Sequence, residues 1–453
     1  MTTETLQDAQ QQALEELSQE FLLSSQQLKD IAKHFKDEME HGLQSDDASV
    51  PMLPSWITRH PTGQETGEYL GLEVSGSVVR IYLVDLLGQG KIKIRHQTKI
   101  HIHDDLKKGP VSQLIDFLAA SVDRFVAPFN IHGPPMALGF VISFPLQQTA
   151  LNRGSVIQWT KDFEISGADR KNLVDLLQTA LRKLQTPVVV EAIMNSAVAC
   201  LLAHSYRSLD TLLACTVSTG TNAAYWEKLS ECSKISGTQE EEMIINTEWG
   251  SFGDKNPKLL PRTVYDNRLN RESWNAGVHI FEKMVSGLYL GELVRNVIID
   301  FVDRRLLFNG NSSKELNQAY FFETSYMSTI ESDSTTQLEE TQHILEAVLN
   351  LPPTTIEDRR VVKKICELVG QRAAQLIAAS MSAVLYKRNA LEDNVTLSVE
   401  GSIYEHYPNF PNRVNAALRE MFGQAVDQIN IGSTRDSHGT GAALAAMIAR
   451  TSK

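Results

Sequence analysis

The chain has 453 residues, of which 42% are hydrophobic and 22% are charged, and its formal net charge is −12 at pH 7. Its length predicts two or three domains, and its composition is typical of a globular protein rather than a disordered one. The acidic balance argues against nucleic acid as a partner, because a phosphate backbone requires a basic protein face.

The N-terminal stretch and the cysteines indicate where such a protein works. The stretch MTTETLQDAQQQALEEL is polar and acidic, unlike a secretory signal or an Arg-rich transit peptide, and no apolar run approaches the roughly 18 residues of a membrane span. The cysteines at positions 200, 215, 232 and 366 lack C-x-x-C spacing, which favours reduced thiols over a metal site. We therefore expect a cytoplasmic protein without membrane insertion, and leave open an association with the nucleus or the mitochondrial surface.

The first predicted elements are a loosely ordered start, a helix and a run of strands. Residues 1–20 are rich in Gln and Glu and are predicted to be frayed or loosely helical. Ser24 and Gln27 have the spacing of a capping box that opens a helix, and the prolines of ASVPMLPSW end it. Apolar side chains then recur at helical spacing: Leu28, Ile31, Phe35 and Met39. Consecutive strands with a Gly-containing turn at 88–90 are predicted over residues 68–102.

Helices and strands alternate through the rest of the chain. A helix at 113–126, a buried strand at 136–146, a helix at 169–184 and a strand at 187–194 follow in order. A second series then begins with a strand, turn and strand over 211–226. Long helical stretches are predicted at 273–308, 335–349 and 358–387, and a glycine turn at 439–441 opens a last helix. Two strand-rich blocks with interleaved helices predict an α/β protein.

Three short turns have the composition of phosphate-binding loops. They read SGS at 75–77, STG at 218–220 and HGTG at 438–441, and each exposes backbone N–H groups together with a hydroxyl. Any one of them is more often a plain tight turn, and the three together leave phosphate binding and simple turns about equally favoured. No G-x-x-x-x-G-K-[ST] pattern is present, so this is not a P-loop protein.

From about residue 20 to its end, the chain resembles the hexokinases of the fungal type. The segments PTGQETGEYLGLEV, GFVISFPLQQTALNRGSVIQWTKDF, INTEWGSFGD, FEKMVSGLYLGELVRNVIIDF and GSIYEHYPNF lie in the family's order. The resemblance implies an α/β, actin-like ATPase (ribonuclease H-like) fold, with two lobes that close on sugar and ATP in a cleft. It also implies the lobe boundaries: residues 1–63 and 197–436 in the large lobe, 64–196 in the small lobe, and 437–453 as a C-terminal helix that returns to the small lobe.

The resemblance implies a hexose pocket that is mostly retained. Hydroxyl-rich sugars need paired donors and acceptors, which amides, carboxylates and hydroxyls supply. The matching residues are Ser143, Thr160, Lys161, Asn195, Asn222, Glu248 and Glu282. Each of these alone would more often be an ordinary cap or a surface residue. The whole set in the family's order favours a glucose or other hexose ligand.

The nucleotide side, in contrast, departs from the family at several positions. The matching residues are Ser75, Gly76, Ser77, Arg80, Thr219, Gly220, Thr324, Ser328, Glu400, Gly401 and His438. Glu73 and Glu400 each stand where the family has Asp, and Ser75 stands where it has Gly, which would be strained if that residue had positive φ. His438 replaces a small Ser, and it is predicted either to crowd the adenine ribose or to be a harmless surface residue.

The most consequential departure is Ser196, which follows Asn195 where the family has its catalytic Asp. Serine cannot take the proton of a sugar hydroxyl near pH 7, and loss of a general base costs roughly 10²- to 10⁴-fold in rate. Glu191, five residues earlier on a predicted strand, lies too far away to substitute. We therefore expect an atypical, non-catalytic member that acts as a sensor or regulator of carbon metabolism.

Two alternatives and several details stay open at this stage. The first alternative is an active ATP-dependent hexokinase of glycolysis, for which the resemblance implies ATP and Mg²⁺; the regulator would need neither. The second is a scaffold with an empty cleft. A regulatory protein partner is expected, and the N-terminal 20 residues and an exposed acidic loop at 328–342 are candidate docking or phosphorylation segments. No resident metal is predicted.

Overall fold

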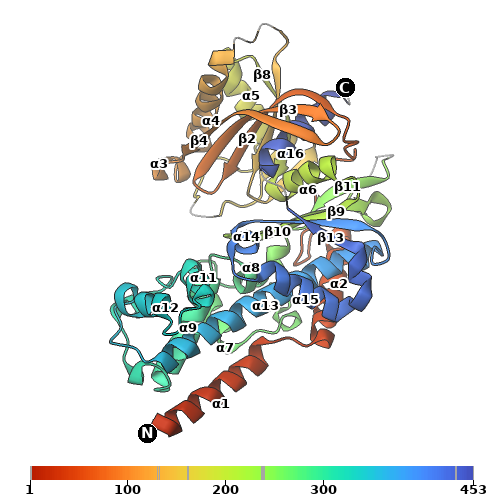
Figure 1. Cartoon of the computed structure of the whole chain (residues 1–453). Coiled ribbons are helices and arrows are strands. Elements are labelled where there is room, and N and C mark those ends of the chain that lie inside the picture. The colour runs from red at the N-terminus through yellow and green to blue at the C-terminus, as the bar shows by residue number, and fades with distance from the viewer. Residues whose placement is uncertain are drawn as a thin grey trace.

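Two β-sheets, stacked along the molecule and separated by helices, organise the fold of this computed structural model (Figure 1). The structure describes residues 3–451 except 130, 132, 161–162, 236–239 and 434–435. The five-stranded sheet has the strand order β4-β3-β2-β5-β8 and the six-stranded sheet has the order β1-β11-β10-β9-β12-β13. A small two-stranded hairpin, β6 (Leu146–Ala150) and β7 (Arg153–Val156), forms a third sheet, in which β6 contacts β1 and β7 contacts β8.

In the five-stranded sheet a hairpin meander continues into parallel strands. Its members are β2 (Thr66–Ser75), β3 (Val78–Gly88), β4 (Lys91–His101), β5 (Met136–Ile142) and β8 (Val188–Asn195). Strands β2, β3 and β4 pair antiparallel, whereas β2, β5 and β8 pair parallel. The carboxyl ends of these three parallel strands therefore lie at one edge, as expected for a ligand-binding edge of an α/β sheet.

Helices cover both faces of this sheet, and successive residues of β2 point to opposite faces. Leu70, Leu72 and Val74 pack with α4 (Val111–Val126) and α5 (Leu173–Lys183) in one core. The residues between them face α16 (Ser437–Thr451), where a Cβ on Gly71 would lie 3.1 Å from the Ala442 Cβ. Glycine at this position therefore lets the C-terminal helix approach the sheet backbone closely.

The six-stranded sheet is also covered on both faces. Its strands are β1 (Leu53–Pro54), β9 (Thr211–Val217), β10 (Thr221–Lys228), β11 (Glu242–Asn246), β12 (Val395–Glu400) and β13 (Ile429–Gly432). On one face Leu213 and Tyr225 share a core with α2 (Ser25–Gln44) and α13 (Ile356–Arg388). On the other face Ala214 and Trp226 pack with α6 (Ser196–Arg207), which lies beside α16 between the two sheets (Figure 1).

The remaining helices lie mostly on the α13 side of the six-stranded sheet, several of them against α13 itself, except the short α3 (Asp104–Lys107), which leads into α4. They are α1 (Thr3–Phe21), α7 (Val264–Glu272), α8 (Ile280–Val285), α9 (Leu290–Asp303), α10 (Lys314–Asn317), α11 (Thr324–Ser332), α12 (Glu339–His343), α14 (Ser402–His406) and α15 (Phe410–Phe422). Among the described helices, one is long and apolar enough to cross a membrane: α13, and 94% of that stretch is buried inside the protein.

Several predicted elements are confirmed and others are wrong. The capping box of Ser24 and Gln27 is present, and the strands at 68–102 form as predicted. Of the two structures predicted for residues 1–20, frayed or loosely helical, the described part from Thr3 onward is a regular helix, α1, because Ala13, Leu17 and Phe21 lie buried against the large core. The stretch 273–308 is broken into α8 and α9, and the glycines at 439 and 441 lie inside α16 rather than in a turn before it.

The segment at 328–342 is an exposed loop only over residues 334–337. It spans the end of α11 and most of α12, and Asp333 and Thr341 within it are buried. The carboxylate of Asp333 accepts hydrogen bonds from the backbone N–H groups of Thr335 and Thr341, which ties the segment down. The lobe boundaries stay a prediction. The five-stranded sheet is drawn from residues 66–195, and the six-stranded sheet from 53–54 and 211–432.

Candidate functional site

Asn195 stands at the junction of the two sheets, as the last residue of β8 and the N-cap of α6. Its side-chain oxygen accepts a hydrogen bond from the Ala197 N–H at 2.9 Å, which is the usual work of an N-cap asparagine. Its amide nitrogen donates to the Phe144 carbonyl at 3.1 Å, and the residue is only 3% exposed. The amide is therefore held in one orientation at the carboxyl edge of the five-stranded sheet.

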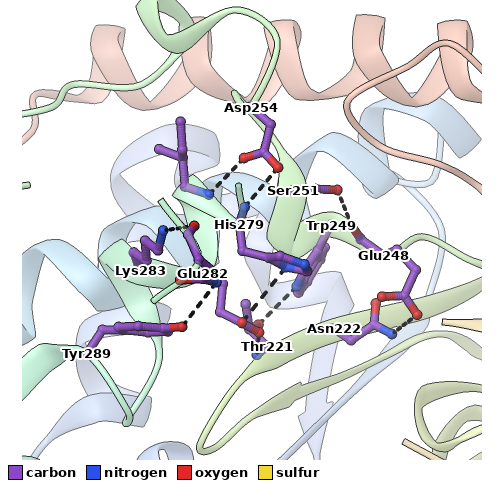
Figure 2. Close-up of polar contacts among 12 residues, drawn as sticks. Thr221, Asn222, Glu248, Trp249, Ser251, Asp254, His279, Glu282, Lys283 and Tyr289 are labelled. Carbon is purple, nitrogen blue, oxygen red and sulfur yellow. Dashed lines mark hydrogen bonds and ion pairs between the residues drawn. The ribbon is translucent and has the colours of Figure 1, made fainter. Parts of the chain in front are cut away.

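A cluster of amides and one carboxylate connects Asn195 to the six-stranded sheet. Glu248 Oε1 accepts hydrogen bonds from the amide nitrogens of Asn222 at 3.1 Å, Asn246 at 2.8 Å and Asn195 at 3.3 Å. Asn222 also donates to the side-chain oxygens of Asn195 and Asn246. Figure 2 shows Asn222 directed at Glu248 from β10. The predicted residues Asn195, Asn222 and Glu248 thus meet, and Asn246 joins them although the sequence did not single it out.

The backbone of Glu248 adopts a conformation that most residues avoid. Its φ is 52° and its ψ is 42°, in the left-handed region, where a residue with a Cβ is strained. The Ser251 hydroxyl donates to the Glu248 carbonyl at 2.8 Å, and the neighbouring Trp249 indole donates to the Thr221 hydroxyl at 2.9 Å. These contacts hold the strained turn, and such strain is found most often at ligand sites.

Glu282 lies on the other side of Thr221, on the short helix α8 (Figure 2). Its Oε2 accepts a hydrogen bond from the Thr221 N–H at 2.9 Å. A Cβ on Gly220 would lie only 2.5 Å from that oxygen, so no other residue fits beside the carboxylate without displacing it. Asp254 fixes the start of α8 because its carboxylate accepts the N–H groups of His279 and Ile280, both at 2.8 Å.

The remaining predicted sugar contacts lie on the five-stranded side. Ser143 follows β5, and its backbone N–H donates to the Val74 carbonyl at 3.0 Å, which ties it to the end of β2. Thr160 is partly buried, and its carbonyl accepts the Phe163 N–H at 3.2 Å. Lys161 lies outside the described residues. The whole arrangement offers carboxylates, amides and hydroxyls on fixed elements, which is the chemistry that binds a polyhydroxylated ligand.

Ser196 is the first residue of α6 and is partly buried. Among the described residues, no hydrogen bond joins its side chain to a carboxylate. Glu191 lies at an irregularity of β8, where the pairing skips between Val190 and Ala192, so strand alternation does not decide which way it points. The length of strand between Glu191 and Ser196 is still roughly 15 Å.

A pocket of about 610 Å³ opens on the helical side of the six-stranded sheet. It contains three of the predicted nucleotide residues, Thr219, Thr324 and Ser328, and also Ser402, which follows Gly401. Its other walls are lined by Gly287, Leu288, Tyr320, Phe322, Glu323, Ser325, Ile403, His406 and Tyr407. The Thr324 hydroxyl is already engaged, because it donates to the Gly287 carbonyl at 2.7 Å and accepts the Gly291 N–H at 2.9 Å. The pocket has the size and the mixed lining of a small-molecule site.

The first predicted phosphate turn is a plain two-residue hairpin between β2 and β3. Ser75 and Val78 pair across it, so Gly76 and Ser77 form the turn itself. The positive φ, 54°, falls on Gly76, and Ser75 is the last residue of a regular strand. The strain predicted for Ser75 is therefore absent, because the conformation that would cause it lies one residue later.

His438 and Glu73, two departures from the family pattern, lie in direct contact. The His438 Nδ1 lies 2.9 Å from Glu73 Oε1, which also accepts a hydrogen bond from Arg80 at 2.9 Å, and Glu73 Oε2 accepts one from the Tyr82 hydroxyl at 2.8 Å. Burial alone would raise the pKa of Glu73, but His438, Arg80 and Tyr82 together lower it to about 2. His438 is therefore not a free surface residue, because its ring is paired with Glu73, and the crowding of a ribose stays a prediction.

Glu400 extends this network toward the pocket. Its Oε2 accepts hydrogen bonds from the Ser437 hydroxyl at 2.5 Å and from the Cys200 thiol at 3.4 Å. Burial raises the pKa of Glu400, and its Oε1 is buried without a hydrogen-bond partner among the described residues. All four cysteines are free and buried, and no described group of His, Cys, Asp and Glu could hold a metal ion.

Comparison with known proteins identifies relatives over nearly the whole chain. The family model described as Hexokinase matches residues 212–448, and a second model of the same description matches residues 13–206. Hexokinase of Kluyveromyces lactis is 35% identical over 94% of this chain and 90% of its own length, and hexokinase-1 of Saccharomyces cerevisiae is 32% identical over 96% and 91%. The solved hexokinase from Schistosoma mansoni complexed with glucose has a TM-score of 0.89 and 32% identity, and the likeness covers 97% of this chain and 99% of that one. The two-lobed, actin-like fold predicted from the resemblance is thereby confirmed.

Proposed function

The chain belongs to the hexokinase family, and from that premise we propose that it binds a hexose, with glucose as the first candidate, and has little or no phosphotransferase activity. It acts as a sensor or regulator in carbon metabolism, in the cytoplasm and through a protein partner. The observation that carries this proposal is Ser196, a hydroxymethyl side chain at the start of α6, directly after the pocket asparagine.

The chemistry of the family requires an acceptor for the proton of the sugar hydroxyl that attacks the γ-phosphoryl group. Glu73 is a further acid near this edge of the sheet, because β2 pairs with β5 and β5 with β8, which puts Glu73 two strands from Met194. A carboxylate whose pKa is lowered to about 2 is a poor base, and both of its oxygens already accept hydrogen bonds. These contacts argue against Glu73 as a replacement base.

The hexose proposal is supported by the cluster around Glu248. Three amide nitrogens converge on Glu248 Oε1, so one carboxylate and three amides form a single set of hydrogen-bonding groups held in fixed positions. A sugar hydroxyl that reaches these groups would exchange hydrogen bonds with water for bonds to preorganised partners. The strained Glu248 backbone and the glycine beside Glu282 are features that a merely structural cluster would not require.

A second candidate function is an active ATP:hexose 6-phosphotransferase of glycolysis. The pocket of about 610 Å³ that contains Thr219 and Thr324 favours it, since a nucleotide donor needs such a site. Phosphoryl transfer also depends on positioning and electrostatic stabilisation more than on the base. This function would require ATP and Mg²⁺ as cofactors.

Two measurements on one preparation separate these functions. Isothermal titration of the full chain with glucose is expected to give saturable heat, and a coupled phosphorylation assay at high protein concentration is expected to give no product above the no-enzyme rate. Absence of both heat and thermal shift at saturating glucose would contradict hexose binding. A turnover in the range of ordinary enzymes, about 1–10³ s⁻¹, would instead establish the active kinase.

A further inference from the structure

The altered positions on the nucleotide side form one connected network. Glu73 lies on β2, His438 and Ser437 on the first turn of α16, and Glu400 at the end of β12. Contacts between 2.5 and 2.9 Å connect Glu73 to His438 and Ser437 to Glu400, and the adjacent His438 and Ser437 complete the path. Three family differences that look independent along the chain are therefore parts of one arrangement.

This arrangement does not fit a magnesium ion. Mg²⁺ needs oxygen ligands, or waters held by carboxylates, in near-octahedral geometry. Glu73, the carboxylate of the first turn, already accepts hydrogen bonds from Arg80, Tyr82 and His438 and is 1% exposed. The second carboxylate that the family would place here is replaced by Ser196. A divalent cation would also approach two cationic side chains, which repel it.

Positive charge is nevertheless present at this end of the site. Arg80 and His438 both pair with the single carboxylate of Glu73, so these three side chains carry a net positive charge while His438 is protonated. Glu400, the other carboxylate of the network, adds less negative charge than an exposed glutamate because burial raises its pKa. Burial lowers the pKa of His438, but its contacts with Cys200 and Glu73 outweigh burial and raise the pKa well above 6.5. The Arg80 side chain is 36% exposed and that of His438 is 24% exposed, so both can be reached by an anion.

The network leads directly to the wall of the pocket of about 610 Å³. Glu400 is followed by Gly401 and Ser402, and the Ser402 hydroxyl lies 3.1 Å from the Ser218 hydroxyl of the second turn. The described lining of the pocket combines aromatic rings and hydroxyl groups with Glu323 and His406, and no Lys or Arg is among these residues. Rings of this kind suit a flat base, and hydroxyls suit a ribose.

We infer that this chain binds an adenine nucleotide without a divalent metal, with the base and ribose in this pocket and the phosphates facing Arg80 and His438. The two side chains supply the positive charge that a metal ion supplies elsewhere. A diphosphate is the best match, because charge-assisted hydrogen bonds from one arginine and one histidine can serve two phosphate groups. This inference does not depend on hexose binding or on catalysis.

The test is a calorimetric titration of the full chain with ADP, once in excess Mg²⁺ and once in EDTA. We expect dissociation constants that agree within about twofold, since no metal takes part in binding. Adenosine, the third probe, is expected to bind about tenfold more weakly than ADP because it lacks the phosphates. Stronger binding of ADP in Mg²⁺, by tenfold or more, would overturn the inference, and so would the absence of ADP binding under both conditions.

A matched set of variants assigns the effect to the network. His438→Ser is expected to weaken the binding of ADP about five- to tenfold in EDTA and to leave the affinity for adenosine unchanged. The control, His101→Ser, at an exposed position on β4, is expected to change neither affinity. The double variant E73D/H438S restores the family's residues at positions 73 and 438. In this variant ADP is expected to bind more tightly in Mg²⁺ than in EDTA. The heat of glucose binding and the thermal unfolding of each variant show whether that variant is folded. A loss of ADP binding with glucose binding intact therefore contradicts or supports the nucleotide inference alone and leaves the hexose proposal unaffected. If His438→Ser leaves ADP binding unchanged, the assignment of the phosphates to this cluster is wrong.

Discussion

The Nδ1 atom of His438 lies 2.9 Å from Oε1 of Glu73, across 365 positions of sequence, and connects the last helix to the second strand. Glu73 accepts from His438, Arg80 and Tyr82 at once, so its charge is balanced without a ligand. In a hexokinase-family chain this places a paired carboxylate beside the first turn of the nucleotide side. The pairing has measurable consequences for stability, ligand binding and activity.

The ion pair predicts a pH window of extra stability. The pKa of Glu73 falls from 4.5 to about 2 on folding, so its contribution is present above pH 4.5 and is lost as pH falls toward 2. The pKa of His438 rises on folding, so its contribution is present below 6.5 and is lost as pH rises through the folded value. The free energy of unfolding of the wild type should therefore exceed that of His438→Gln by about 1–3 kcal/mol at pH 5–6, and by less at high pH. Thermal unfolding of both proteins across pH measures this, and a constant difference would contradict it.

Restoring an aspartate at the start of α6 should not restore an ordinary enzyme. Ser196→Asp supplies a base, but Glu73 stays paired and the nucleotide side keeps its altered residues. We expect the coupled assay to show at most about 10²-fold more product than wild type, which is the low end of what a general base supplies. A turnover above roughly 10 s⁻¹ would mean that these alterations do little harm.

Glu248 is expected to dominate hexose affinity. Glu248→Gln removes the charge on which three amide nitrogens converge, and a lost charged hydrogen bond costs about 1.5–3 kcal/mol, so glucose should bind roughly 10- to 100-fold more weakly. The matched control is Glu392→Gln, at an exposed position before β12. Titration calorimetry measures both, and equal affinities would exclude Glu248 from the site.

A single methyl group beside Glu282 should disturb the same ligand. A Cβ on Gly220 would lie 2.5 Å from Glu282 Oε2, so Gly220→Ala must displace that carboxylate or the turn. We expect glucose affinity to fall about tenfold, which corresponds to about 1.4 kcal/mol. Gly133→Ala, where a Cβ would meet nothing within 4 Å, is the control and should bind as wild type does.

The start of α8 offers a prediction that separates positioning from contact. Asp254 accepts hydrogen bonds from two backbone N–H groups there. No described hydrogen bond joins its side chain to a predicted sugar residue. Asp254→Ala should cost about 1–2 kcal/mol of unfolding free energy, as expected for loss of a cap. It should also weaken glucose through Glu282, and Asp254→Asn should recover part of both effects. Chemical denaturation and calorimetry of the two variants are the measurements.

Local sequence patterns predicted local structure well. The capping box at Ser24 and the strand–turn–strand units depend on residues a few positions apart, and the structure contains them. For residues 1–20 the sequence left frayed and loosely helical structure open, because the stability of α1 comes from tertiary burial of Phe21, whose ring lies 4.2 Å from the Arg372 guanidinium carbon. A Gln-rich composition carries no sign of that partner.

Within the site, the sequence predicted residues but not their partners. Asn195, Asn222 and Glu248 were each expected, yet Asn246 was not, although it stands two residues before Glu248 in INTEWG. The pairing of Glu73 with His438 was missed for a different reason. Glu73 and His438 lie far apart in the sequence and depart from the family pattern separately. Only the packing of α16 against β2 shows that the two side chains meet.

The position of α16 also constrains how the molecule is made. Strands β2, β5 and β8 are synthesised long before α16, yet a Cβ on Gly71 or Gly139 would press on or collide with Ala442, so these strands are shaped to receive that helix. During translation the α16-facing side of the five-stranded sheet therefore stays exposed to solvent until residues 437–451 have left the ribosome. Premature termination anywhere upstream would leave that face open, and chaperones and proteases would encounter it first.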